Sequence, residues 1–86
     1  ISHAYINQGC VIEGEVKNSV LFTGSRIAPE AKIIDSVLMP NVIVEEGAVV
    51  TRALIADGVR IGAGAVVGSP DSEHIELIAK RVKGEE

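Results

Sequence analysis

Aromatic residues are almost missing from this chain of 86 residues: Tyr5 and Phe22 are the only two, and there is no tryptophan. Bulky rings usually fill the middle of a compact sandwich, so this composition argues against such a core. The hydrophobic content is nevertheless 47%, supplied mostly by valine, isoleucine, leucine and alanine. We therefore expect a thin structure whose interior is filled by aliphatic side chains.

The chain also has little cysteine, no excess of basic residues and no long apolar run, and each of these absences excludes a class of protein. The single cysteine, Cys10, excludes an internal disulfide and fits a reducing, cytoplasmic location. The net charge of −4 gives no basic footprint for nucleic acid, and no apolar run approaches the length of a membrane span. There is no signal peptide, and the chain starts at Ile1 without a methionine, from which we expect a piece of a longer protein.

Residues that could carry chemistry are equally sparse. The two histidines, His3 and His74, lie far from each other and from Cys10, which speaks against a metal cluster or a nucleophile with its base. Gly62-Ala-Gly64 lacks the lysine or helix signal of a phosphate-binding loop. We therefore predict no catalytic, cofactor-binding or metal-binding residue in this chain.

What the sequence does have is a repeat that runs from Cys10 to Val67 and returns at every seventeenth position. Residues seventeen apart match in type and form apolar columns. These columns are Cys10, Ile27, Val44, Ile61; Val16, Ile33, Val50, Val67; and Leu21, Leu38, Ile55. A fixed period of this size predicts a solenoid, in which each coil buries its apolar edge against its neighbours.

The spacing within a repeat indicates which solenoid this is. Successive large apolar columns, as in Ile27, Ile33, Leu38 and Val44, are six, then five, then six positions apart, which gives three short edges per coil. This hexapeptide rhythm, with a small residue four places after the first column, is typical of an all-β, triangular parallel β-helix. We place the β-helix at residues 1–68 and a turn with a capping segment at 69–86. Turns through positive φ are predicted at one column of residues: Asn7, Gly24, Asn41 and Gly58.

Two groups of outward residues are candidate sites. Tyr5, Phe22 and Met39 each follow a leucine-type position, so we predict an outward apolar stripe that serves as an interface between domains or subunits. Arg26 and Arg60 share a column two coils apart and could hold an effector phosphate. In the tail, residues 73–83 fit either a helical stripe or a strand, and periodicity does not decide between them.

Two runs carry a family resemblance: Gly9-Cys-Val-Ile-Glu-Gly-Glu-Val-Lys-Asn-Ser-Val-Leu-Phe-Thr-Gly24 and Asp35-Ser-Val-Leu-Met-Pro-Asn41. They resemble the C-terminal left-handed β-helix domain of bacterial ADP-glucose pyrophosphorylase (glucose-1-phosphate adenylyltransferase), over roughly residues 1–68. In that family a separate N-terminal domain converts ATP and glucose 1-phosphate to ADP-glucose and pyrophosphate, with magnesium, on the route to glycogen.

The resemblance implies a regulatory and assembly domain. Its partners would be the N-terminal catalytic domain, further subunits of a homo- or hetero-oligomer, and a phosphorylated metabolite as allosteric effector. Origin from a catalytic or a regulatory subunit stays open. The alternative is a piece of a hexapeptide-repeat acyltransferase with an active site between subunits. The position of both histidines outside the regular coils argues against this alternative.

Overall fold

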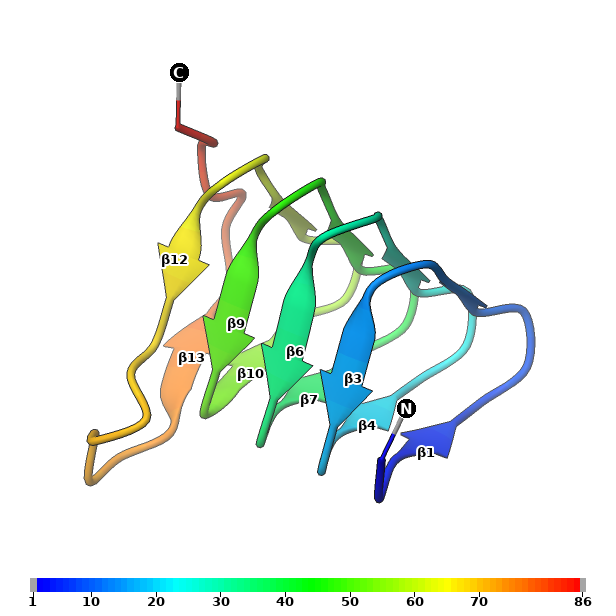
Figure 1. Cartoon of the computed structure of the whole chain (residues 1–86), viewed down its shortest axis with the longest axis horizontal. Helices are drawn as coiled ribbons and strands as arrows, with labels where there is room; N and C mark the ends of the chain where they lie inside the picture. Colours follow the sequence, from blue (N-terminus) through cyan, green and yellow to red (C-terminus); the bar gives the residue numbers. More distant parts are fainter. Residues whose placement is uncertain (1, 86) are drawn as a thin grey trace.

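Figure 1 shows the computed structural model of the chain, which describes residues 2–85 as a stack of three-sided coils. Each coil places one short strand in each of three parallel sheets, here named A, B and C. Sheet A contains β3 (Glu15–Lys17), β6 (Lys32–Ile34), β9 (Val49–Thr51) and β12 (Val66–Val67). Sheet B contains β1 (Tyr5–Ile6), β4 (Val20–Leu21), β7 (Val37–Leu38), β10 (Ala53–Ile55) and β13 (Glu76–Ile78). Sheet C contains β2 (Val11–Ile12), β5 (Arg26–Ile27), β8 (Ile43–Val44) and β11 (Arg60–Ile61).

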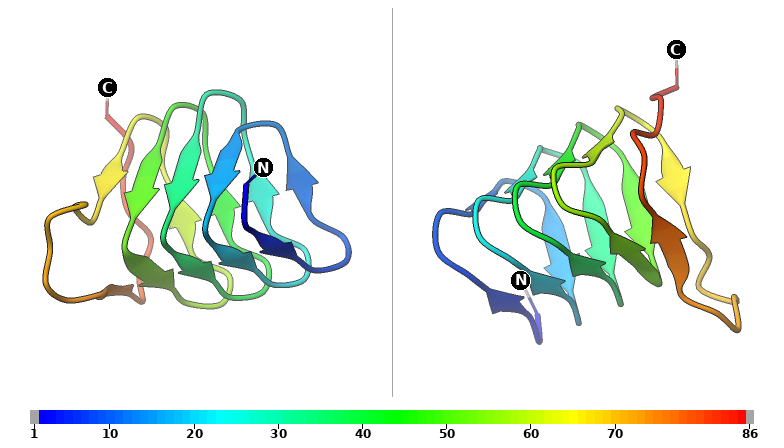
Figure 2. Two further views of the ribbon diagram at one scale, coloured as in Figure 1. Left: turned by 60° about the horizontal axis from the view of Figure 1, so that its bottom comes forward. Right: turned by 180° about the vertical axis from the view of Figure 1, so that it is seen from behind.

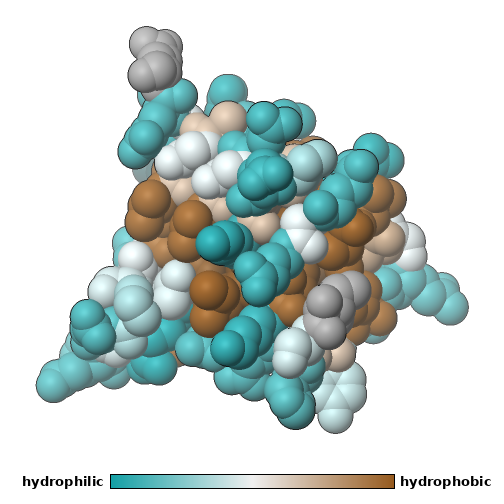
Figure 3. Space-filling model, in the orientation of Figure 1, coloured by the Kyte–Doolittle hydropathy of each residue, from teal (hydrophilic) through white to brown (hydrophobic). Residues whose placement is uncertain are grey.

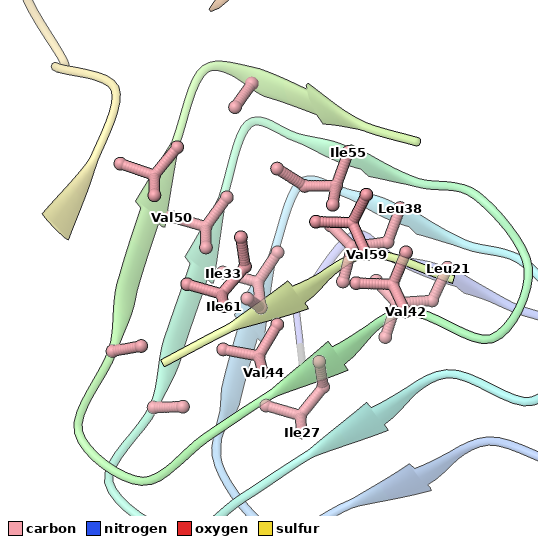
Figure 4. Close-up of a cluster of buried hydrophobic side chains, with 14 of the residues drawn as sticks. Leu21, Ile27, Ile33, Leu38, Val42, Val44, Val50, Ile55, Val59 and Ile61 are labelled. Carbon is pink, nitrogen blue, oxygen red and sulfur yellow. The ribbon is translucent and has the colours of Figure 1, made fainter. Parts of the chain in front are cut away.

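The stacking of like residues confirms the predicted parallel β-helix. From β3 to β12, strands of successive coils pair in register with partners seventeen positions apart, as in Ile27↔Val44 and Ile33↔Val50, except where β2 pairs with β5. The three apolar columns meet inside the prism, where Ile33, Leu38 and Val44 have no exposed surface (Figure 4). The all-β, three-sided architecture is that of a left-handed β-helix, and residues 2–85 contain no helix that could span a membrane.

The first coil departs from the period. Ile12, not Cys10, pairs with Ile27, and Tyr5 pairs with Val20, so partners here are only fifteen positions apart. The turn from β2 to β3 explains this, because it has two residues where the following coils have four. Gly14 occupies this tight turn, and a Cβ there would overlap the carbonyl oxygen of Ala31. The predicted place of Cys10 in the first apolar column is therefore wrong.

Apart from the turn at Glu13–Gly14, every corner of the coils between β1 and β12 turns through a residue with positive φ. At the corner between sheets B and C the prediction is correct for Gly24, Asn41 and Gly58 and wrong for Asn7, whose place Gly9 takes (φ 77°) because of the shortened coil. The other two corners use residues that the sequence pattern did not reveal. These are His3, Asn18, Asp35 and Arg52 between sheets A and B, and Glu30, Gly47 and Gly64 between sheets C and A.

Two buried serines link successive coils at the corner between sheets A and B. The Ser36 N–H donates to Ser19 Oγ (3.0 Å), and the Ala53 N–H donates to Ser36 Oγ (3.1 Å). Each hydroxyl in turn donates to a carbonyl oxygen two residues earlier in its own coil. The serines thereby satisfy backbone groups that the turn would otherwise leave buried and unpaired.

The C-terminal segment adds a strand to the stack, and its described residues, up to 85, form no helix. β13 pairs with β10 through partners twenty-three positions apart, such as Leu54↔Leu77, and Val82 forms an isolated bridge with Ile61. The ambiguity over residues 73–83 is thus resolved in favour of a strand at 76–78. The six residues in excess of the period lie in the loop 68–75, which projects away from the coils at the lower left of Figure 1 and in Figure 2. A turn at Ser69–Ser72, predicted from the sequence, opens this loop.

Candidate interaction surface

The outer side of sheet B carries one apolar residue per strand. Ladder pairs place five such side chains side by side, and we call them the outer row of sheet B: Tyr5, Val20, Val37, Leu54 and Leu77. The residue that follows each of them lies in the core or packs against it, as alternation in a strand requires: Ile6, Leu21, Leu38, Ile55 and Ile78. The two ends of the row are largely exposed, Tyr5 at 79% and Leu77 at 65%, and the three middle side chains are half-buried.

The outer rows of the other two sheets are mixed in character. Sheet A presents Glu15 and Lys32 before Val49 and Val66, and Figure 3 shows hydrophilic and hydrophobic side chains interspersed over that face. Sheet C alternates apolar residues with arginines along its ladder: Val11, Arg26, Ile43, Arg60. Of the three faces formed by residues 2–85, sheet B alone has an apolar side chain at every outer-row position. Such a continuous row is typical of a contact surface.

A shallow hollow of about 280 Å³ adjoins the outer row of sheet B at the corner with sheet A. Tyr5, Val20 and Val37 form its apolar lining. Its polar edge includes Asn18 and Asp35, where Asn18 Nδ2 donates to Asp35 Oδ1 at 2.7 Å. The outer face of sheet B is therefore not flat, and this hollow is large enough to accept an apolar side chain.

Acidic groups surround the arginines of sheet C. A groove of about 290 Å³ holds Arg26 together with Glu13, Glu45 and Glu46. Arg60 Nη1 donates to Glu45 Oε2 at 2.6 Å, and the Ala63 N–H donates to Glu45 Oε1 at 3.1 Å. The hydrogen bond from Arg60 is the main cause that holds the pKa of Glu45 below its ordinary value. With three carboxylates in one groove, this surface disfavours a phosphate.

A family model described as "GlmU-like, C-terminal hexapeptide" matches residues 1–82. This match covers nearly the whole chain and coincides with the coils of the β-helix. The chain belongs to the GlmU-like C-terminal hexapeptide family.

Among curated relatives of this hexapeptide domain is the glucose-1-phosphate adenylyltransferase of Bacillus cytotoxicus, 37% identical over 83 residues, which are 95% of this chain and 22% of the relative. The enzymes of the same name from Bacillus thuringiensis (strain Al Hakam) and Bacillus mycoides are each 39% identical over 81 residues, 93% of this chain and 22% of the relative. The resemblance seen in the sequence is thus confirmed. The chain spans about a fifth of the length of these relatives.

The predicted stripe of Tyr5, Phe22 and Met39 does not form one column in this hexapeptide domain. Phe22 and Met39 do occupy neighbouring coils, as the hydrogen bond from the Phe22 N–H to Leu38 O indicates. Tyr5, however, lies beside Val20, since the shortened first coil moves it by two positions. Phe22 is 36% exposed and Met39 is half-buried. The three residues therefore belong to two adjacent rows of the same outer face.

The predicted phosphate ligands Arg26 and Arg60 lie on one face, separated by Ile43. Arg60 is paired with Glu45, and Arg26 is exposed near three carboxylates. Within residues 2–85, no three histidine, cysteine, aspartate or glutamate side chains are grouped so as to hold a metal ion. His3 and His74 are both exposed.

Sequence reasoning missed four residues of the outer row: Val20, Val37, Leu54 and Leu77. A signal for three of them was present, because each directly precedes a member of the leucine column. In a strand both neighbours of an inward residue point outward, so these positions were as eligible as Phe22 and Met39. Leu77 had no such signal, since its strand pairs outside the regular period.

Proposed function

We propose that this chain is the C-terminal assembly and regulatory domain of a cytoplasmic glucose-1-phosphate adenylyltransferase. The observation that carries the proposal is the apolar outer row of sheet B, on a hexapeptide domain that matches about a fifth of adenylyltransferases of that name. Such a face needs a partner to cover it. Its partners would be a catalytic domain of the same polypeptide and other subunits of an oligomer.

Catalysis would reside outside this chain. The parent enzyme would use ATP, magnesium and glucose 1-phosphate in a catalytic domain, and the β-helix would supply rigidity and contact area. A phosphorylated effector at Arg26 and Arg60 stays a prediction, and the carboxylates around Arg26 weigh against it. The acyltransferase alternative is not favoured, because the relatives are adenylyltransferases.

A segment exchange tests this proposal. The matching segment of the Bacillus cytotoxicus enzyme is either deleted or replaced by this chain, and oligomeric mass and pyrophosphate release are measured. We expect the deletion to lose assembly and turnover, and the chimera to recover the oligomer with at least part of the activity. A chimera that behaves like the deletion contradicts the proposal.

The chain by itself provides the matched control. Mixed with ATP, glucose 1-phosphate and magnesium, it should release no pyrophosphate, because no catalytic group is predicted in it. Turnover by the isolated chain would contradict the assignment of catalysis to another part of the protein. Binding of an acyl-CoA would support the acyltransferase alternative and count against an adenylyltransferase origin.

A further inference from the structure

We propose that the edge of sheet C at residues 60–63 is a strand-accepting site, and that residues 79–85 form a detachable strap that occupies it. Three backbone hydrogen bonds hold the strap there: from the Val82 N–H to Arg60 O (3.0 Å), from the Gly62 N–H to Val82 O (2.8 Å) and from the Glu85 N–H to Ala63 O (2.8 Å). The strap thus lengthens sheet C in the same way as a peptide that binds by strand addition. The inference goes beyond the proposed assembly function and does not rest on it.

The strap and the edge approach each other through a pair of glycines. A Cβ on Gly62 would overlap the backbone nitrogen of Gly84, and a Cβ on Gly84 would overlap the backbone of Ala63. Neither glycine has a positive φ, so the close approach, and not the backbone conformation, requires them. At the ladder positions equivalent to Gly62, the earlier coils accommodate side chains: Glu13, Ala28 and Glu45. The requirement for glycine is therefore particular to the contact with the strap.

Little besides these backbone contacts fixes the strap. Within residues 79–85 only Val82 is not exposed, and it packs half-buried against the core. In the same column of sheet C, by contrast, Val44 and Ile61 have no exposed surface. Segments that bury little apolar surface open locally at a lower free energy than the core that they cover. We therefore expect the strap to detach while the coils stay folded.

The geometry of the edge defines the kind of segment that fits it. An extended backbone must pair with the Gly62 N–H and with the carbonyl oxygens of Arg60 and Ala63. An apolar residue must lie level with Ile61, and a glycine must follow two positions later, over Gly62. Residues 82–84 of the strap have this pattern, apolar–x–glycine. A partner segment of the same pattern would compete with the strap, so release of the strap controls access to the site.

Native-state hydrogen exchange of the unaltered chain, followed by NMR, tests whether the strap detaches. The Gly62 N–H, bonded to the strap at Val82 O, is compared with the Ala28 N–H, which is bonded to Val44 O at an equivalent position two coils earlier. We expect the protection factor of Gly62 to be at least about ten-fold lower than that of Ala28. Equal protection factors would show that the strap opens only together with the coils, and would overturn the proposal.

A peptide titration tests the site itself. Gly84→Val in the full chain should displace the strap, because its side chain would overlap the edge, and should leave the far-UV circular dichroism unchanged. A synthetic peptide of residues 79–85, added up to about 5 mM to cover weak binding, should then shift the NMR signals of residues 60–63. Lys83→Val is the matched control: it places the same side chain at an exposed position, so the strap should stay bound and exclude the peptide.

Two further measurements show whether the glycine pair determines binding. A peptide that carries Gly84→Val should leave the signals of residues 60–63 unshifted. Adding Gly62→Ala to the Gly84→Val chain should abolish binding of the natural peptide, since the new Cβ would lie where the peptide backbone passes. The proposal fails if the natural peptide does not bind the Gly84→Val chain, or if both peptides bind it equally. The exchange experiment, made on the unaltered chain, is decisive even where a variant unfolds.

Discussion

Ile33→Ala is the sharpest test of the stacked columns. Ile33 has no exposed surface and pairs in register with Val16 in the coil before it and Val50 in the coil after it. The substitution removes three buried carbon groups, at about 0.8 kcal/mol each. A residual void of roughly 50 Å³ adds about 1.2 kcal/mol at about 24 cal/mol per Å³. The free energy of unfolding should therefore fall by about 3–4 kcal/mol.

Urea and thermal unfolding, followed by circular dichroism, measure this loss. For a domain of this size each kcal/mol lowers the melting temperature by about 4–8 °C, so a fall of at least about 12 °C is expected. Glu46→Ala is the control, since Glu46 is exposed on a corner and its substitution should change the free energy by less than about 0.5 kcal/mol. Comparable losses for the two variants would refute the assignment of Ile33 to a sealed core column.

Three smaller predictions concern polar groups and turns. An NMR titration should give Glu45 a pKa below its ordinary value of 4.5, and Arg60→Gln should return the pKa towards that value. Because the folded pKa is the lower one, the contribution of Glu45 to stability should be present above the unfolded pKa and be lost as the pH falls through the folded pKa, with a smaller pH dependence in Glu45→Gln. Ser36→Ala should cost about 1–3 kcal/mol in urea unfolding, since it leaves the Ala53 N–H buried without an acceptor, whereas Ser69→Ala on the exposed loop should cost almost nothing. Gly68→Ala should destabilise more than Gly58→Ala, because both glycines have positive φ but only at Gly68 would a Cβ overlap the carbonyl oxygen of Thr51; equal melting temperatures would contradict this geometry.

The regular coils could be predicted from the sequence because their evidence is local and repeated. Val16, Ile33, Val50 and Val67 recur at one spacing, and only a structure that stacks equal coils buries all four. The same argument identified the turns at Gly24, Asn41 and Gly58. The turn positions Asn18, Asp35 and Arg52 escaped it, because their residue types differ and arginine is not typical of positive φ.

The strand pairing of the first coil could not be predicted from the sequence. The period was read from the later coils, and it gives the wrong partners wherever a turn has a different number of residues. Asn7 resembles Asn41, and Cys10 is as apolar as its assigned column, so the period looked intact back to Asn7. The two-residue turn at Glu13–Gly14 shifts everything before it by two positions, an even number that keeps inward residues inward. The shift is therefore invisible to hydrophobic alternation and shows only in which residues become neighbours.

That shift determines the shape of the candidate surface. With the regular period, Tyr5 would lie beside Phe22, at the edge of the outer face of sheet B. With the shortened first coil it lies beside Val20 and becomes the first member of a row that continues through Val37 and Leu54 to Leu77. The long loop 68–75 acts in the same way at the other end, because its six extra residues bring Leu77 level with Leu54. Two departures from the repeat, one shortening and one insertion, thus complete an apolar row across all five strands of sheet B, and the proposed contact depends on both.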